Sequence, residues 1–171
     1  MGVNILTASG RPTTLGDDAV QQLSASVAGT VLTALSPGYA EARTVWNAMI
    51  DRRPALIVQC TSADDVEATV RFARQHNLVI AVRGGGHNIA GNALVDDGLV
   101  IDLSKMQTVT VDPAAKRARV EPGATLALNC CTASSPSVVG RPLAVRIFTP
   151  IIDLESEEKS RSHDPYGYVG S

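Results

Sequence analysis

Hydrophobic and polar positions follow an ordered pattern between residues 54 and 106. Residues 55–60 (ALIVQC) form a continuous apolar run of strand length, which is typical of a strand buried in a parallel sheet. Residues 62–76 carry an apolar stripe at helical spacing, and residues 78–83 (LVIAVR) predict a second strand. Strand, crossover helix and strand at this spacing predict a right-handed βαβ unit.

The two ends of the predicted helix carry their own signals. Ser62 followed by Asp65 three residues later resembles a capping box, with aspartate in place of the usual glutamate. Asn77 suits the left-handed conformation that often ends a helix. These boundary residues support a helix that lies directly between the two predicted strands.

The pattern predicts further strands after this unit. Residues 98–106 (GLVIDLSKM) predict a strand and its exit. Residues 108–112 and 116–122 contain alternating segments separated by turn residues, which predicts a β-hairpin. Residues 123–128 (GATLAL) are expected to start a helix.

The N-terminal region is predicted to be a leader over residues 1–39 that contains one short helix. Residues 1–16 are expected to be loose, and Asp17 or Asp18 can cap a helix that reaches about Val27. Residues 30–35 (TVLTAL) predict a short strand that ends in a turn.

The periodic pattern stops after about Leu128. We therefore expect an ordered domain over residues 40–128, and a divergent, poorly ordered tail over residues 129–171 that is weakest beyond about Pro150.

Composition and charge exclude several classes of protein. The chain has 171 residues and a formal net charge of -2, which suits one domain and gives no electrostatic case for binding nucleic acid or an anionic membrane. The N-terminus has no basic start followed by an apolar stretch, and no apolar run approaches the roughly 20 residues of a membrane span. We expect a cytoplasmic protein. Its cysteines fit neither a disulfide framework nor a metal ligand set: Cys60, Cys130 and Cys131.

The stretch AVRGGGHNIAG, residues 81–91, carries the strongest chemical signal. Successive glycines after a strand place several backbone N–H groups in one concavity, and the missing Cβ atoms let anion oxygens approach. Its spacing fits neither the dinucleotide fingerprint nor a phosphate-binding P-loop. The residues alone also fit a flexible turn, so both interpretations stay open at this point.

His87 stands directly behind these glycines. Neutral imidazole is a competent nucleophile and general base near neutral pH. No second histidine, cysteine or carboxylate stands at metal-ligand spacing, so no metal site is expected. His76 at a helix end and His163 in the tail are weaker candidates.

The order of these features resembles the N-terminal part of FAD-linked oxidases of the p-cresol methylhydroxylase (PCMH) type. Within that type, the chain is similar to the branch that contains berberine bridge enzymes and 6-hydroxynicotine oxidases. The resemblance is carried by the buried strand, the capped helix, the next strand, RGGGHNIAG, VIDLSKM and a hairpin that ends in VEPGATL.

This resemblance implies an α+β fold with a small βαβ-containing FAD-binding subdomain and a following β-hairpin. It implies that FAD is the cofactor and that the motif histidine, His87 here, is bonded to the 8α-methyl group of the flavin. It also implies an FAD-dependent oxidoreductase that uses oxygen as acceptor and a small-molecule substrate that the sequence does not identify. Asp102 is expected to be a structural carboxylate. The implied FAD-binding residues are Arg83, Gly84, Gly85, Gly86, His87, Asn88 and Gly91.

The chain departs from the family pattern after EPGATL. A second glycine-rich block and a substrate domain with its catalytic base are expected there, and the sequence shows neither. Cys130 and Cys131 are not placed to be a second covalent link to flavin. We therefore expect a truncated product and assign no catalytic residue. The alternatives are a catalytically incomplete fragment and a module that binds phosphate-containing ligands without redox activity.

Overall fold

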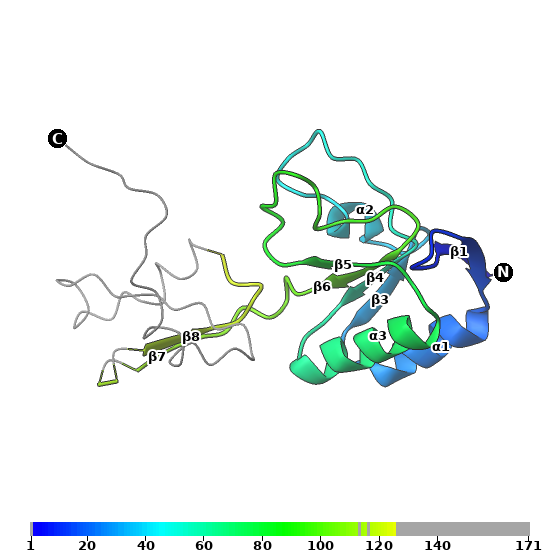
Figure 1. Ribbon diagram of the computed structural model, residues 1–171. Helices are drawn as coiled ribbons and strands as arrows, with labels where there is room; N and C mark the ends of the chain where they lie inside the picture. The colour runs from blue at the N-terminus through cyan, green and yellow to red at the C-terminus, as the bar shows by residue number, and fades with distance from the viewer. Residues whose placement is uncertain (1, 113, 116, 126–171) are drawn as a thin grey trace, which may run out of the picture.

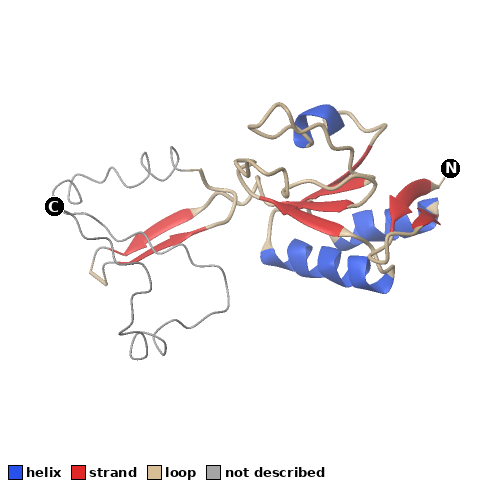
Figure 2. Cartoon of the chain, turned by 45° about the horizontal axis from the view of Figure 1, so that its top comes forward, coloured by secondary structure: helices blue, strands red, loops and turns tan. Residues whose placement is uncertain are grey.

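A four-stranded mixed sheet forms the centre of the computed structural model, which describes residues 2–112, 114–115 and 117–125 (Figure 1). Its strand order is β3-β4-β6-β5, with β4, β6 and β5 parallel and β3 antiparallel to β4. Two separate hairpins, β1-β2 and β7-β8, flank it in the chain (Figure 2). The elements are β1 Val3–Leu6, β2 Pro12–Leu15, α1 Asp17–Ser26, β3 Thr30–Thr33, α2 Tyr39–Ala42, β4 Leu56–Gln59, α3 Ala63–Gln75, β5 Ile80–Arg83, β6 Leu99–Asp102, β7 Val109–Asp112 and β8 Arg117–Val120.

Strand β4 is covered on both faces, which explains its continuous apolar sequence. Leu56 and Val58 join the cluster beneath α1 and α3, whereas Ile57 joins the cluster on the α2 side. All three side chains are fully buried. Helices α1 and α3 lie on one face of the sheet and α2 lies on the other (Figure 1). A strand with two buried faces needs apolar residues at every position, so the predicted strand is confirmed.

The predicted β4-α3-β5 unit is present, but its two strands are not neighbours. Strand β6 lies between them, with Val100 opposite both Ile57 of β4 and Ala81 of β5. The space between the two strands of the unit is thus filled by a strand from later in the chain. Local spacing predicts that two strands run parallel, but it carries no information on which strand separates them.

Helix α3 begins at the predicted residue, with one difference in its cap. The Ser62 hydroxyl accepts a hydrogen bond from the Asp65 backbone N–H (3.2 Å), as expected for an N-cap. The Asp65 carboxylate instead accepts from the N–H groups of Thr61 (2.8 Å) and Ala28 (2.7 Å), so it ties the helix to the turn after α1. Asn77 adopts the predicted left-handed conformation (φ 50°).

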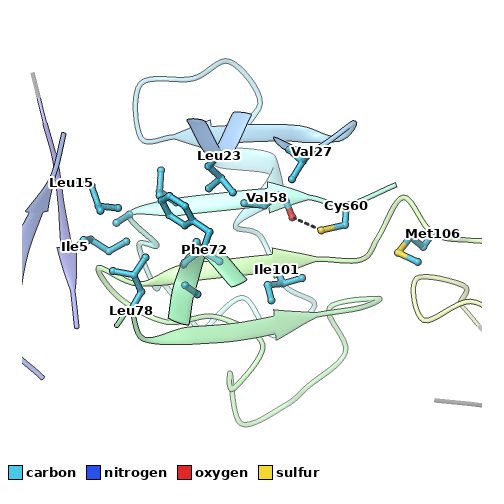
Figure 3. Packing of buried hydrophobic residues seen from close by; sticks show 14 residues of the cluster. Ile5, Leu15, Leu23, Val27, Val58, Cys60, Phe72, Leu78, Ile101 and Met106 are labelled. Carbon is cyan, nitrogen blue, oxygen red and sulfur yellow. Dashed lines mark hydrogen bonds between the residues drawn. The ribbon is translucent and has the colours of Figure 1, made fainter. Parts of the chain in front are cut away.

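Residues 1–16 are not the loose leader that the sequence predicts. Strands β1 and β2 pair as an antiparallel hairpin, and Ile5 and Leu15 enter the same core as Leu23 and Phe72 (Figure 3). The hairpin also reaches the start of β5, because the Val79 N–H donates to the Leu6 carbonyl (3.0 Å). Each strand is only four residues long and contributes one fully buried side chain, too few to produce a periodic signal.

The rest of the N-terminal region also belongs to the folded unit. Helix α1 begins after Gly16, and Asp17 and Asp18 occupy its first turn, where carboxylates favour the helix dipole, instead of capping it. The strand predicted within residues 30–35 is confirmed as β3, which pairs with β4. Ordered structure therefore starts well before residue 40.

The predicted hairpin over β7 and β8 is confirmed. The turn that leaves it packs closely on the exit of β6: a Cβ at Gly123 would lie 2.0 Å from the Leu103 carbonyl oxygen. Gly123 lies in a turn and residues 124–125 have no regular secondary structure, so these residues do not start a helix. Residues 126–128 and the predicted tail, with Cys130 and Cys131, lie outside the described residues. Within the described residues, no helix is long and apolar enough to cross a membrane.

Asp65 should make the protein sensitive to acid. Burial opposes ionisation of its carboxyl, but hydrogen bonds from Thr61 and Ala28 outweigh burial and hold its pKa below the ordinary 3.8. This stabilisation is complete above the ordinary pKa and is lost as the pH falls through the lower folded-state value. Asp65→Asn should lower the free energy of unfolding at pH 7 by about 1–3 kcal/mol and flatten its dependence on acidic pH, measured by urea unfolding.

Asp64→Asn is the matched control for this prediction. Asp64 lies on the same helical turn, but its side chain is exposed. This variant should keep the acid dependence of the original protein. Equal acid dependence in both variants would contradict the role assigned to Asp65.

Cys60 should report whether the core is intact. Burial raises the pKa of its thiol to about 11, so the thiol stays protonated at pH 8. In a variant with Cys130→Ser and Cys131→Ser, Cys60 is the only cysteine. A thiol reagent at pH 8 should then label it only as fast as the protein unfolds, measured by mass spectrometry with and without urea. Labelling of the folded protein at the rate of a free thiol would show that the core opens.

Candidate functional site

A hollow of about 250 Å³ lies beside the glycine loop that follows β5. Most of the residues predicted to bind a cofactor line it, and Asn92 and Ala93 complete its wall. Arg83, the last residue of β5, and Gly91, in the loop, do not line the hollow. The lining residues are Val82, Gly84, Gly85, Gly86, His87, Asn88, Asn92 and Ala93.

The loop backbone is available to bind an anion. Within the described part of the chain, the N–H groups of Gly84, Gly85, Gly86 and His87 donate to no acceptor. Gly86 has a positive φ of 74°, a conformation that L side chains rarely adopt. A turn of this kind exposes consecutive N–H groups that can converge on phosphate oxygens. The predicted anion-binding loop is therefore compatible with the observed backbone.

Close contacts explain two of the loop glycines. A Cβ on Gly84 would lie 2.7 Å from the Pro122 carbonyl oxygen, because the exit of the β7-β8 hairpin packs against the loop. A Cβ on Gly91, which has a φ of 76°, would lie 2.9 Å from Ile50. Both glycines therefore let other segments approach the loop directly.

Arg83, the last residue of β5, is engaged on the side of the sheet. Its Nη1 pairs with Asp102 Oδ1 (2.9 Å), and its Nη2 donates to the Thr44 carbonyl (3.1 Å). Asp102 is fully buried and also accepts from the Ser104 N–H (3.0 Å) and from Gln59 Nε2 (3.4 Å). These bonds are structural, as predicted for Asp102.

Residues 44–50, here called the strap, run along the glycine loop. The Trp46 N–H donates to the Gly86 carbonyl (3.0 Å), and Asn47 Nδ2 donates to the Ile89 carbonyl (3.0 Å). Sequence reasoning did not find this segment as part of the site, because its contacts use mainly backbone groups and leave no motif. The side chain of Trp46 is 73% exposed.

A salt bridge holds the base of the strap. Arg43 pairs with Asp51, and this hydrogen bond lowers the pKa of the Asp51 carboxyl. Because the two residues flank the strap in sequence, the pair closes it into a loop.

Of the three histidines, His87 alone lies at the hollow among those that the structure describes. Its side chain is exposed, and a Cβ on Gly85 would lie 3.1 Å from its ring. His76 packs against Phe72 at the end of α3, with ring centroids 4.4 Å apart. His163 lies outside the described residues. The described residues contain no cluster of histidine, cysteine and carboxylate side chains that could hold a metal ion.

This part of the chain is similar to known proteins. Residues 54–134 match the family described as FAD binding domain. The match includes β4, α3, β5, the glycine loop and β6.

Curated relatives carry the same segment within much longer chains. (R)-6-hydroxynicotine oxidase of Paenarthrobacter nicotinovorans is 40% identical over 98 residues, which cover 57% of this chain and 21% of the relative. An uncharacterised FAD-linked oxidoreductase of Bacillus subtilis is 39% identical over 98 residues, covering 57% of this chain and 22% of the relative. The chain thus spans about a fifth of the length of these relatives.

Solved structures give the same result. The 6-hydroxy-D-nicotine oxidase of Arthrobacter nicotinovorans superposes with a TM-score of 0.56 at 39% identity, covering 58% of this chain and 22% of that one. A BBE-like protein of Physcomitrella patens superposes with a TM-score of 0.53 at 27% identity and the same coverage. Residues 54–134 therefore match an FAD binding domain, and FAD-linked oxidoreductases, among them a 6-hydroxynicotine oxidase and a BBE-like protein, are similar to this part of the chain.

Proposed function

We propose that this chain binds FAD through its glycine loop, with the pyrophosphate on the N–H groups of residues 84–87. The observation that carries the proposal is a run of four backbone N–H groups that have no acceptor among the described residues. They lie beside a hollow and inside the matched domain segment. Two negatively charged phosphates need several donors at close range, and glycine backbone supplies them without Cβ atoms in the way. The side chains of His87 and Asn88 border the same space.

The size of the hollow limits which part of FAD it can hold. Its volume of about 250 Å³ is smaller than the roughly 300–1,000 Å³ of pockets that enclose a whole drug-sized ligand. The hollow therefore fits the phosphate portion, and the rest of the cofactor must be covered by other groups. In a complete relative, those groups would belong to the four fifths of the protein that this chain does not match.

His87 is the proposed covalent anchor. Its ring is exposed at the hollow, where a neutral imidazole nitrogen would be placed to bond to the 8α carbon of the flavin. The 8α-methyl group and the imidazole would each give up a proton, and the two electrons released would stay on the flavin and then pass to oxygen. Protonation would occupy the lone pair of the imidazole nitrogen, so attachment requires neutral His87. The support for this role is the position of His87 in the motif and its exposure at the hollow.

The proposed role in a complete enzyme is that of the cofactor-holding part of an FAD-dependent oxidoreductase. Bound FAD would supply hydride chemistry with a small-molecule substrate, and oxygen would be the final acceptor. The residues of this chain bind and orient the cofactor, and we assign no base for the substrate proton among them. We propose residues 40–128 as the FAD-binding segment, supported by the hairpin, helix and strand of residues 1–39.

Reconstitution with FAD tests both parts of this proposal. The purified chain should take up FAD and keep flavin absorbance after acid precipitation, because a covalent bond survives unfolding. His87→Ala should bind FAD reversibly and lose all acid-stable absorbance, whereas His76→Ala, which changes a histidine outside the hollow, should behave like the original chain.

Three results would count against this proposal in different ways. Acid-stable flavin in His87→Ala would place the anchor elsewhere. A chain that does not bind FAD would be a catalytically incomplete fragment. A chain that binds inorganic pyrophosphate as tightly as FAD would be a phosphate-binding module, the alternative function without redox activity.

A pair of glycine variants separates cofactor binding from backbone strain. Gly86 and Gly38 both have positive φ (74° and 82°), and a Cβ at either position would meet no atom closer than 3.6 Å. Gly86→Ala and Gly38→Ala should therefore lose similar stability, about 1–3 kcal/mol, in thermal or urea unfolding.

Only Gly86→Ala should also weaken FAD binding, by about tenfold or more, which corresponds to about 1.4 kcal/mol at 25 °C. Fluorescence titration with FAD measures this in the His87→Ala background, where binding is reversible. Equal FAD affinity in the two variants would contradict a direct role of the loop.

A further inference from the structure

We propose that Arg83 is a positioning residue that holds the glycine loop in its conformation, and not a ligand of the phosphates. This inference rests on the proposed function of the loop. It differs from the expectation drawn from the motif, in which Arg83 belongs to the cofactor-binding set. The structural basis is the Arg83–Asp102 pair together with the strap.

Both terminal nitrogens of the Arg83 side chain donate to protein groups. Its two terminal nitrogens are used by the Asp102 carboxylate (2.9 Å) and by the Thr44 carbonyl (3.1 Å), and its Nε is buried without a partner. The side chain is 14% exposed and does not line the hollow. If the guanidinium turned into the hollow to reach a phosphate, the fully buried Asp102 carboxylate would lose its cationic partner, which is strongly unfavourable.

Pairing with Asp102 also removes most of the electrostatic benefit that Arg83 could give to a bound phosphate. The positive guanidinium and the negative carboxylate are in direct contact, so their fields at the hollow largely cancel. The attraction for the pyrophosphate must then come mainly from the backbone N–H groups. Arg83 contributes by holding those groups in place.

The Arg83 contacts form part of a closed arrangement around the loop. Arg83 Nη2 bonds to Thr44, and two residues later Trp46 bonds to the Gly86 carbonyl. A Cβ on Gly86 would lie 3.6 Å from both Nε and Nη2 of Arg83, so the guanidinium lies directly against the loop. The Arg83 side chain thus contacts both the strap and the glycine loop from the end of β5.

The geometry of arginine suits this role better than that of lysine. A guanidinium presents its donors in a rigid planar fork, which serves a carboxylate and a carbonyl simultaneously. A lysine ammonium keeps the charge but is a single point on a flexible stem. Arg83→Lys therefore separates a requirement for charge from a requirement for the fork.

The experiment compares Arg83→Lys, Arg83→Met and Asp102→Asn in the full chain. FAD affinity is measured at low and high salt in the His87→Ala background, where binding is reversible. Hydrogen exchange of the Trp46 N–H, which donates to the Gly86 carbonyl, is measured in flavin-free protein. Arg71→Met is the control, since Arg71 forms an exposed pair with Glu67 on α3. Arg83→Met combined with Asp102→Asn, which leaves no unpaired buried charge, covers the case in which Arg83→Met alone does not fold.

For a positioning role, Arg83→Lys and Asp102→Asn should each weaken FAD binding by about tenfold, as expected when one charge-assisted hydrogen bond is lost. The salt dependence of FAD binding should stay that of the chain with Arg83 and Asp102 in place, and exchange of the Trp46 N–H should become faster. The double variant should bind no more weakly than Arg83→Met, because the two residues act as one unit. The control should change neither quantity.

For a phosphate ligand, Arg83→Lys should keep FAD affinity, Asp102→Asn should not weaken it, and Arg83→Met should reduce its dependence on salt. That result would overturn the positioning role. If the original chain binds no FAD, the proposed function fails, but hydrogen exchange still decides this inference: unchanged exchange in the Arg83 and Asp102 variants overturns it, and faster exchange supports it.

Discussion

The buried carboxylate of Asp102 organises the end of the sheet on which the candidate site is built. It lies at the end of the central strand β6 and accepts hydrogen bonds from Gln59 at the end of β4, Arg83 at the end of β5 and the turn at Ser104. A fully buried charge is tolerated only when it is paired and hydrogen-bonded. Asp102 therefore fixes the ends of β4 and β5 and the turn after β6 relative to one another. The glycine loop starts at the end of β5.

A loop that binds anions through its own N–H groups must leave those groups without internal partners. It consequently lacks the hydrogen bonds that hold an ordinary turn, and neighbouring segments must define its shape instead. The strap supplies bonds to the carbonyls of Gly86 and Ile89, and Pro122 packs against Gly84. The hydrogen bonds from the strap use carbonyl groups of the loop and leave its backbone N–H groups available.

The elements that the sequence predicted well are those that depend on local rules. A strand buried on both faces is apolar throughout, and the cap at Ser62 and the left-handed Asn77 follow from backbone geometry. The placement of β6 between β4 and β5 is a nonlocal choice that no spacing encodes. The N-terminal hairpin was missed because Ile5 and Leu15 become core residues only once Leu23 and Phe72 cover them.

The same distinction applies to the site. The glycines and His87 are recognisable because the chemistry needs those residue types at those positions. The strap is invisible in the sequence, because its bond to Gly86 comes from the backbone of Trp46, and every residue except proline has such a donor. Arg83 was found, but its role depends on whether its guanidinium meets a ligand or a buried carboxylate, which only the folded arrangement decides.

Under the proposed function, a partial site gives the covalent link a particular importance. A hollow of about 250 Å³ can make contacts with the phosphates but leaves most of a flavin uncovered, so noncovalent binding alone would be weak. A bond at His87 would make the cofactor part of the chain, and its effective concentration at the loop would then depend on geometry instead of affinity. That bond can form only if the loop already holds the imidazole and the phosphate-binding groups in register. The contacts of Arg83, Asp102 and the strap would therefore act before attachment, because they fix the conformation of the glycine loop in flavin-free protein.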